Sequence, residues 1–321
     1  MKKTSSVRLY KEGKPCENFN QRIKNWLEMR EVLKEHATPK AFESLRKLYS
    51  QNLDELLLVS ENPNDRWSAH RNLLSNLTNV MYGIDIAAEL APRLSPESIN
   101  LSGFRTALSQ GAAKNTGENF INIIVYILAD ILSNQDEVLV VKGLPPMLRE
   151  PLTLKRIFTR KDGVMREIKI PIEGDLCVFS RSNPFNAIVV NAKTRLKEIF
   201  HIGTMWKIFF DMIDDDYLLN KWGLRKDPAL PSVLSTNMHY VFITADMIKT
   251  DGTNTQGGDV ERDDVRNLIA MDASFFDYVF VSKQNISHVS NSIDINSERE
   301  ALFHELGCLL DMINQKFNIN I

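Results

Sequence analysis

Cysteine and long apolar runs are scarce in this 321-residue sequence. The three cysteines, Cys16, Cys177 and Cys308, are far apart and form neither a metal-ligand spacing nor a disulfide framework. No apolar run reaches the roughly 18 residues of a membrane span. The N-terminal lysines are not followed by the apolar segment of a signal peptide. These absences favour a protein of the reducing cytoplasm.

A surplus of one sign of charge is missing as well. The 39 Lys and Arg residues and the 41 Asp and Glu residues give a formal net charge of −2. This balance excludes a protein that is basic over its whole surface, but it allows a basic cleft that acidic residues offset elsewhere. Hydrophobic residues make up 43% of the chain and charged residues 25%, which is typical of a folded globular protein. The loop motifs of P-loop nucleotide binding and of serine hydrolases are absent.

Helical patterns fill the first part of the chain, and strand patterns begin further on. Residues 1–100 have apolar residues at helical spacing, and Thr38-Pro39 is a helix-start signal. Residues 101–321 begin with a long helix and continue with about six short apolar runs. A capping box from Ser297 to Glu300 predicts a closing helix. We therefore predict an α/β protein, with a mixed β-sheet core flanked by helices over residues 101–321 and an all-helical N-terminal region over residues 1–100.

A basic β-hairpin is predicted between residues 152 and 172, with its turn near Asp162-Gly163. Its central part contains six basic residues and only two acidic residues, Asp162 and Glu167. The basic residues are Lys155, Arg156, Arg160, Lys161, Arg166 and Lys169. Such a hairpin can bind phosphate groups locally although the whole chain is close to neutral. The alternative is an edge strand that charge protects from pairing with other chains.

Polar residues stand at the ends of the next two predicted strands. Asp175 opens the first strand and Lys193 closes the second, and a polar turn joins them. If the two strands pair as antiparallel neighbours, both residues lie at the same end of the sheet. Side chains alternate along a strand, so Asn191 and Lys193 share one face while Ala192 points away. We expect the carboxylate, the amide and the ammonium group to converge on one point.

This combination of groups suits the hydrolysis of a phosphodiester bond. A carboxylate can hold Mg²⁺, which acidifies a bound water and neutralises charge in the transition state. The lysine can lower the pKa of the attacking water or donate a hydrogen bond to a phosphate oxygen. One carboxylate is a weak magnesium site, so a second acidic residue is expected. Glu118, at the start of the apolar part of the long helix, is the candidate.

The segment from Asp175 to Asn191-Ala192-Lys193 resembles the PD-(D/E)xK nuclease motif, with Asn191 in the place of the second acid. The continuation from Lys193 to Glu198, KTRLKE, resembles the segment that reads bases in type II restriction endonucleases of the group that cuts CCGG, CCNGG or CCWGG sites. In that group an acid from elsewhere in the chain replaces the missing one. Asp211 and Glu198 are candidates for it.

The resemblance implies roles for particular residues. The implied catalytic residues are Asp175, Lys193, Glu118 and Asn191, and the implied metal ligands are Asp175, Glu118 and Ala192. The DNA contacts are expected from Arg195, Lys197 and Glu198 after the motif, and from Lys155, Arg156 and Arg160 of the hairpin. On the helix, Arg195 and Lys197 could bind guanine and Glu198 could accept from cytosine.

The implied function is Mg²⁺-dependent, sequence-specific cleavage of double-stranded DNA that leaves 5′-phosphates. The expected partners are double-stranded DNA, a second copy of the chain in a homodimer, and a cognate DNA methyltransferase that acts in the same system without being bound. The helical region over residues 1–100 could clamp DNA, form the dimer interface or serve as scaffold. Two other functions stay open: a repair or junction nuclease on the same core, and a DNA-binding protein that has lost catalysis.

Overall fold

The computed structural model describes residues 39–59, 66–78, 102–194, 200–228, 230, 237–245, 267–284, 286–299 and 301–319. The chain divides into two compact units, one of residues 1–41 and 85–115 and the other of residues 42–84 and 116–321. The second unit contains all the strands that the structure describes. The helices predicted within residues 1–38 and 79–100 lie outside the described residues, and the boundary near residue 100 stays a prediction.

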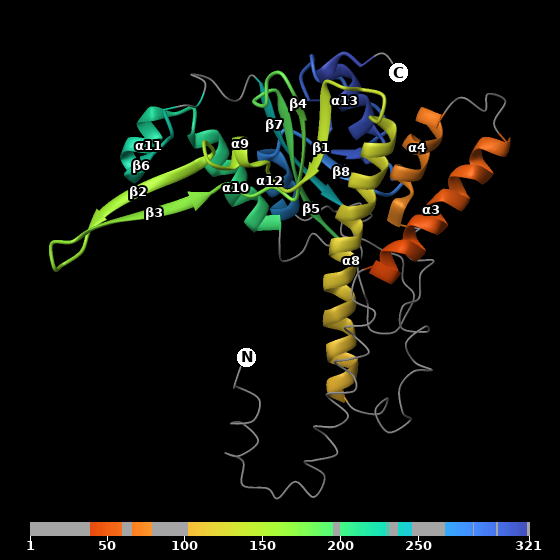
Figure 1. Ribbon diagram of the computed structural model, residues 1–321, viewed down its shortest axis with the longest axis horizontal. Helices are drawn as coiled ribbons and strands as arrows, with labels where there is room; N and C mark the ends of the chain where they lie inside the picture. Colours follow the sequence, from red (N-terminus) through yellow and green to blue (C-terminus); the bar gives the residue numbers. More distant parts are fainter. Residues whose placement is uncertain are drawn as a thin grey trace, which may run out of the picture. The chain divides into compact units, whose positions relative to one another are not determined.

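A seven-stranded mixed sheet runs through the second unit in the order β1-β4-β5-β7-β8-β10-β9 (Figure 1). The first three strands pair antiparallel, and the strands from β5 to β9 pair parallel. The strands are β1 (Val138–Lys142), β4 (Leu176–Ser180), β5 (Ala187–Lys193), β7 (Met238–Thr244), β8 (Val279–Val281), β9 (Val289–Ser290) and β10 (Phe303–Glu305). The predicted mixed α/β fold class is confirmed.

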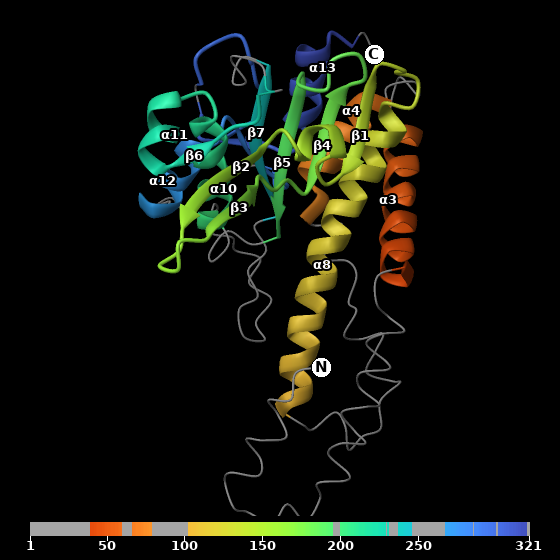
Figure 2. The same ribbon diagram turned by 60° about the vertical axis from the view of Figure 1, so that its left-hand side comes forward.

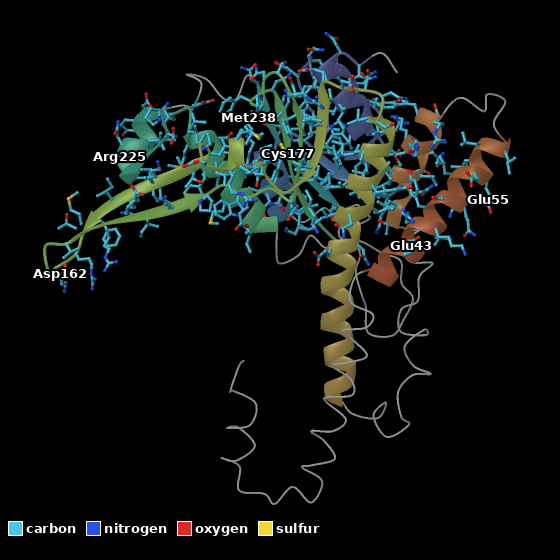
Figure 3. The ribbon with its side chains drawn as sticks, viewed as in Figure 1. Glu43, Glu55, Asp162, Cys177, Arg225 and Met238 are labelled. Atoms are coloured by element: carbon cyan, nitrogen blue, oxygen red, sulfur yellow. The ribbon has the colours of Figure 1, made fainter. Side chains whose placement is uncertain are left out.

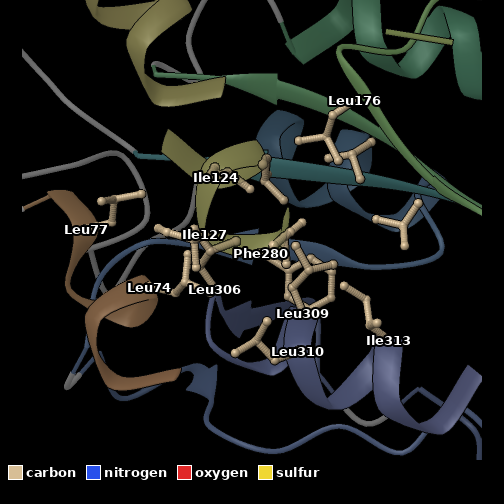
Figure 4. Packing of buried hydrophobic residues seen from close by; sticks show 14 of the residues in the cluster. Leu74, Leu77, Ile124, Ile127, Leu176, Phe280, Leu306, Leu309, Leu310 and Ile313 are labelled. Carbon is tan, nitrogen blue, oxygen red and sulfur yellow. The ribbon is translucent and has the colours of Figure 1, made fainter. Parts of the chain in front are cut away.

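Each face of this sheet supports one hydrophobic core, because side chains alternate along every strand. On one face, Leu176 and Val190 pack with the helices α3 (Pro39–Val59), α4 (Arg66–Ser75), α8 (Ser102–Ile131) and α13 (Cys308–Phe317) (Figures 1 and 4). On the other face, Cys177 and Val189 pack with α9 (Pro146–Arg149), α10 (Phe200–Met212), α11 (Asp216–Trp222) and α12 (Asn267–Phe275). The central strands are therefore buried on both faces. None of the helices that the structure describes is long and apolar enough to cross a membrane.

The end of the chain differs from the prediction. The expected helix from residue 297 begins only at Cys308, and residues Phe303–Glu305 form β10 beside β8. Ser297 donates to the carbonyl of Asp294. Phe303 is almost fully buried, and β10 forms backbone hydrogen bonds with β8 on one side and with β9 on the other. The apolar spacing fits a helix locally, but pairing with a distant strand decides the structure of this segment.

A smaller three-stranded sheet, in the order β3-β2-β6, carries the predicted hairpin. It consists of β2 (Thr153–Thr159), β3 (Met165–Pro171) and β6 (Leu224–Arg225). The turn lies at Asp162-Gly163 as predicted, with Gly163 at a φ of 82°, a backbone conformation that favours glycine. In Figures 1 and 2 the outer end of this hairpin extends away from the seven-stranded sheet, and Figure 3 labels Asp162 there.

Candidate active site

The candidate site lies where β4 begins and β5 ends. The two strands pair antiparallel, as expected, with Leu176 opposite Val190. Asp175 stands just before β4, and its N–H donates to the carbonyl of Val190 at 2.8 Å. The carbonyl of Asp175 accepts from the N–H of Gly143, which follows β1, at 2.7 Å. Three neighbouring strands therefore fix the backbone that carries this carboxylate.

Asp175 and Lys193 form an ion pair at this end of the sheet. Lys193 Nζ lies 2.7 Å from Asp175 Oδ2, and the N–H of Ala192 donates to the same oxygen at 2.8 Å. The two side chains are 24% and 27% exposed, so the pair is partly shielded yet open to a ligand from solvent. The structure thus brings together the acid and the ammonium group that the sequence suggested. Their catalytic role stays a prediction.

Asn191 adds a buried oxygen to the same face of β5. The residue is 3% exposed, and its Nδ2 donates to the hydroxyl of Tyr240 at 3.4 Å. In the part of the chain that the structure describes, Oδ1 of Asn191 has no hydrogen-bond partner. Leaving a buried acceptor unpaired costs about 1–3 kcal/mol. A hydrogen-bond donor or a cation at this oxygen would offset that cost.

Tyr240 is the site residue that the sequence did not reveal. Its hydroxyl donates to the carbonyl of Glu173 at 2.6 Å and accepts from Asn191. Burial raises the pKa of Tyr240, so the hydroxyl keeps its proton at neutral pH. β5 and β7 pair in parallel, with Val189 opposite Tyr240, and they are far apart in sequence. The sequence gives no local signal for this contact, because Tyr240 is only one residue of an apolar strand pattern.

A close backbone approach explains the glycine before Asp175. A Cβ atom on Gly174 would lie 2.7 Å from Cγ1 of Val189 and 3.5 Å from Cγ of Leu144. Val189 is fully buried in the centre of the sheet and has little freedom to move. Glycine therefore lets the segment before β4 lie against β5 at the point where Asp175 meets Lys193.

Glu118 is placed apart from the ion pair of Asp175 and Lys193. Its carboxylate pairs with Lys142 Nζ at 3.1 Å, and Lys142 also donates to Asn122 at 3.0 Å. Lys142 stands opposite Leu176 in the sheet and shares with it the face covered by α8. The residue after Asp175 is Leu176, so Asp175 points to the other face. The polar contacts of Glu118 and of Asp175 are thus with different lysines, and the metal role of Glu118 stays a prediction.

Asp211, a candidate for the displaced acid, lies in another cluster. It forms an ion pair with Lys207, whose ammonium group is also 3.2 Å from Asp277. The carboxylate of Asp277 accepts from the N–H of Tyr240, near the start of β7. Burial raises the pKa of Asp211. This cluster binds α10 to the sheet, and its contacts do not include Asp175.

The residues predicted to contact DNA fall into two groups. Arg195, Lys197 and Glu198 lie outside the described residues, as does the start of the helix expected there. On the hairpin, Lys155 Nζ lies 3.5 Å from Asp227 Oδ2, and Arg160 Nε lies 3.8 Å from Asp162 Oδ2. The side chain of Arg156 is exposed. The hairpin thus offers basic groups at the surface, and their role stays a prediction.

The oxygen atoms beside Lys193 fit a hard cation such as Mg²⁺. The N–H of Ala192 and the ammonium group of Lys193 both donate to Oδ2 of Asp175. On the same face, Oδ1 of Asn191 has no hydrogen-bond partner among the described residues. Mg²⁺ prefers oxygen ligands and keeps several waters, so a carboxylate, an amide oxygen and substrate phosphate are ligands of the kind that it binds. Across the described ranges, no three His, Cys, Asp or Glu side chains gather into a metal cluster. A metal here would therefore depend on Asp175.

The fold and the site define a mixed α/β protein with a carboxylate–lysine pair at the end of its sheet. No family model and no curated protein matches the chain. Among solved structures, the restriction endonuclease PspGI–substrate DNA complex is similar over 90% of this chain and 93% of that chain. The sequence identity is 15% and the TM-score is 0.38, values that do not decide what this chain does.

Proposed function

We propose that this chain is a Mg²⁺-dependent, site-specific endonuclease of the type II restriction kind, which hydrolyses double-stranded DNA and leaves 5′-phosphates. The observation that carries the proposal is the 2.7 Å contact between Asp175 and Lys193 at the shared end of β4 and β5. The spacing to Asn191-Ala192-Lys193 and the KTRLKE continuation add the resemblance to PD-(D/E)xK nucleases.

The residues of the site have distinct roles in this proposal. Asp175 would hold Mg²⁺, with Asn191 Oδ1 and Ala192 as further ligands, while Glu118 keeps its ion pair with Lys142 on the other face of the sheet. When bound, the metal supplies an acidified water and neutralises charge on the phosphate. Asp175 is oriented by the N–H of Ala192, so its carboxylate is positioned before any substrate arrives. Lys193 donates to the scissile phosphate or to the attacking water, and the 3′ oxygen leaves.

The partners in this proposal follow from the symmetry of the substrate. A duplex with a palindromic site has two equivalent strands to cut, and a homodimer presents one site to each strand. The hairpin residues Lys155, Arg156 and Arg160, with Arg195, Lys197 and Glu198, contact the DNA. A DNA methyltransferase of matching specificity would protect the host DNA.

One observation favours a second candidate, a DNA-binding protein without catalysis. That observation is the amide of Asn191, which stands where the motif has an acid. Under this alternative the Asp175–Lys193 ion pair would be structural. The two candidates differ in whether the purified chain cuts DNA.

A digestion experiment separates the candidates. Unmodified bacteriophage DNA is incubated with the purified chain and Mg²⁺, and the products are resolved on a gel. The proposal predicts discrete fragments with 5′-phosphate ends and none when EDTA replaces Mg²⁺. Nicking confined to branched or mismatched duplexes supports a repair nuclease instead. Intact DNA under all conditions, together with a retained gel shift, supports the binding protein.

A further inference from the structure

The outer part of the hairpin carries basic and apolar side chains on one face. In the antiparallel register Phe158 stands opposite Arg166, and Arg156 stands opposite Ile168. Opposed residues and alternate residues share a face of a β-ribbon, so these four side chains point to the same side. All four are exposed, with Phe158 at 38% and Ile168 at 47%. We call this set the ribbon face.

The ribbon face continues a face that is buried nearer to the sheet. Leu154 and Leu224, on the same side of the ribbon, are buried in the core under α10 and α11. Beyond them the covering elements end, and the hairpin runs outward (Figures 1 and 2). The exposed Phe158 and Ile168 thus extend a packed surface into solvent, where the described part of the chain provides no cover.

The charge on the ribbon face has one sign. No salt bridge joins Arg156 or Arg166 to a carboxylate among the residues that the structure describes. Glu167 lies on the opposite face, because it neighbours Arg166 in the strand. Lys155, also on the opposite face, pairs with Asp227. A polyanion therefore fits the ribbon face, because its negative groups can pair with both guanidinium groups. A partner surface without acidic residues would leave Arg156 and Arg166 unpaired.

We propose that the ribbon face enters the major groove of DNA and reads base edges there. The proposal rests on the proposed function and adds a specificity-determining element to it. A two-stranded ribbon with its side chains is about 10 Å thick, which suits the major groove of about 12 Å and not the minor groove of about 6 Å. Arg156 and Arg166 can each bind guanine O6 and N7, and Phe158 and Ile168 can contact thymine methyl groups.

The first test selects sequences from a pool. A pool of duplexes with a random central segment is incubated with the chain in Ca²⁺, and bound duplexes are sequenced. Wild type is expected to enrich a motif. Arg156→Ala and Arg166→Ala are expected to lose the preference for particular guanines by about ten-fold. Arg225→Ala is the control, because Arg225 stands opposite Lys155 in the register and so lies on the other face of the small sheet. It removes the same charge and should keep the full motif.

The second test identifies the groove. The enriched duplex is made with 7-deazaguanine at the motif guanines, which removes the N7 acceptor from the major groove. Wild type should bind this duplex about ten-fold more weakly, and a double variant with Arg156→Ala and Arg166→Ala should no longer distinguish it from the ordinary duplex. Equal binding of both duplexes by wild type would overturn the proposal, as would an unchanged motif in both arginine variants.

Two further results distinguish a failure of the ribbon-face proposal from a failure of the proposed nuclease function. Discrete cleavage by wild type together with an intact motif in the ribbon variants would refute base recognition by the ribbon face and leave the nuclease standing. Motif selection that depends on Arg166, without cleavage in Mg²⁺, would refute the nuclease and support the ribbon.

Phe158→Ala should leave the sedimentation coefficient of the free protein unchanged. A variant that changes oligomeric state without changing DNA selection would assign the face to a second copy of the chain.

Discussion

At the scale of single residues, the side chain of Asn191 is the one whose role in metal binding most needs a test. Its buried Oδ1 has no partner in the described part of the chain, and its position in the motif is that of an acid. Replacing the amide by a carboxylate would add a charged oxygen ligand beside Asp175. Asn191→Asp is therefore expected to lower the Mg²⁺ concentration for half-maximal cleavage by about ten-fold.

A Mg²⁺ titration of the initial cleavage rate measures this effect. Asn183→Asp makes the same change of charge in the turn at the other end of β4 and β5 and should leave the titration midpoint where it is. An Asn191→Asp midpoint equal to or above that of wild type would show that Asn191 Oδ1 does not face the metal.

Gly174 tests how tightly the site is packed. Gly174→Ala would place a methyl group 2.7 Å from a methyl carbon of Val189, and the buried strand has no space to receive it. We expect a loss of about 1–3 kcal/mol in the free energy of unfolding. Gly117→Ala is the matched control, since a Cβ atom there meets nothing within 4 Å and the position is helical. Urea denaturation of both variants checks the difference, and equal midpoints would contradict the close approach.

At the scale of elements, the turn between β4 and β5 is held by one carboxylate. Oε1 of Glu137, just before β1, accepts from the N–H of Ser182 at 2.9 Å and from the hydroxyls of Ser180 and Ser182. These hydrogen bonds lower the pKa of Glu137 to about 2 from its usual value. The turn joins the strands that carry Asp175 and Lys193, so its stability supports the register of the site.

The pH dependence of stability follows from the sign of this shift. A carboxyl group with a lowered pKa in the folded state stabilises the protein above its unfolded pKa of about 4.5, and this contribution is lost as the pH falls towards 2. Wild type should therefore lose more stability than Glu137→Gln between pH 5 and pH 2.5. Thermal melts of both proteins across this range measure the difference, and parallel curves would count against the hydrogen-bonded turn.

The elements differ in how far the sequence predicts them. The hairpin at Asp162-Gly163 and the pairing of β4 with β5 join neighbouring segments, so local turn residues and alternation suffice to predict them. The helix predicted for the segment around β10 is wrong, because the structure of this segment depends on its pairing with β8, which is distant along the chain. The same reason hides Tyr240, which reaches Asn191 only through the parallel pairing of β5 and β7.

For the whole molecule, the central position of β5 matters most. β5 joins the antiparallel part of the sheet to the parallel part, and helices cover both of its faces. Lys193 is therefore fixed by a strand that is buried nearly to its end. A site on such a strand is held more precisely than one on a loop, as a hydrolytic centre requires.

The proposed homodimer predicts a mass. One chain has a mass of 36.7 kDa, and a two-fold assembly on a palindromic duplex would contain two. Sedimentation velocity of the protein with a stoichiometric duplex carrying the selected motif should show two chains for each duplex. A single chain for each duplex at every concentration would contradict the symmetric arrangement and favour sequential cutting of the strands.

The most direct measurement compares the cleavage rate with DNA affinity in Lys193→Ala and Asp175→Asn. If the pair forms the hydrolytic centre, both variants bind the duplex within a few-fold of wild type while their single-turnover cleavage in Mg²⁺ falls by at least about 100-fold. Lys47→Ala, an exposed lysine on α3, should cut at the wild-type rate. Cleavage by Lys193→Ala or by Asp175→Asn at a rate close to that of wild type would contradict the account.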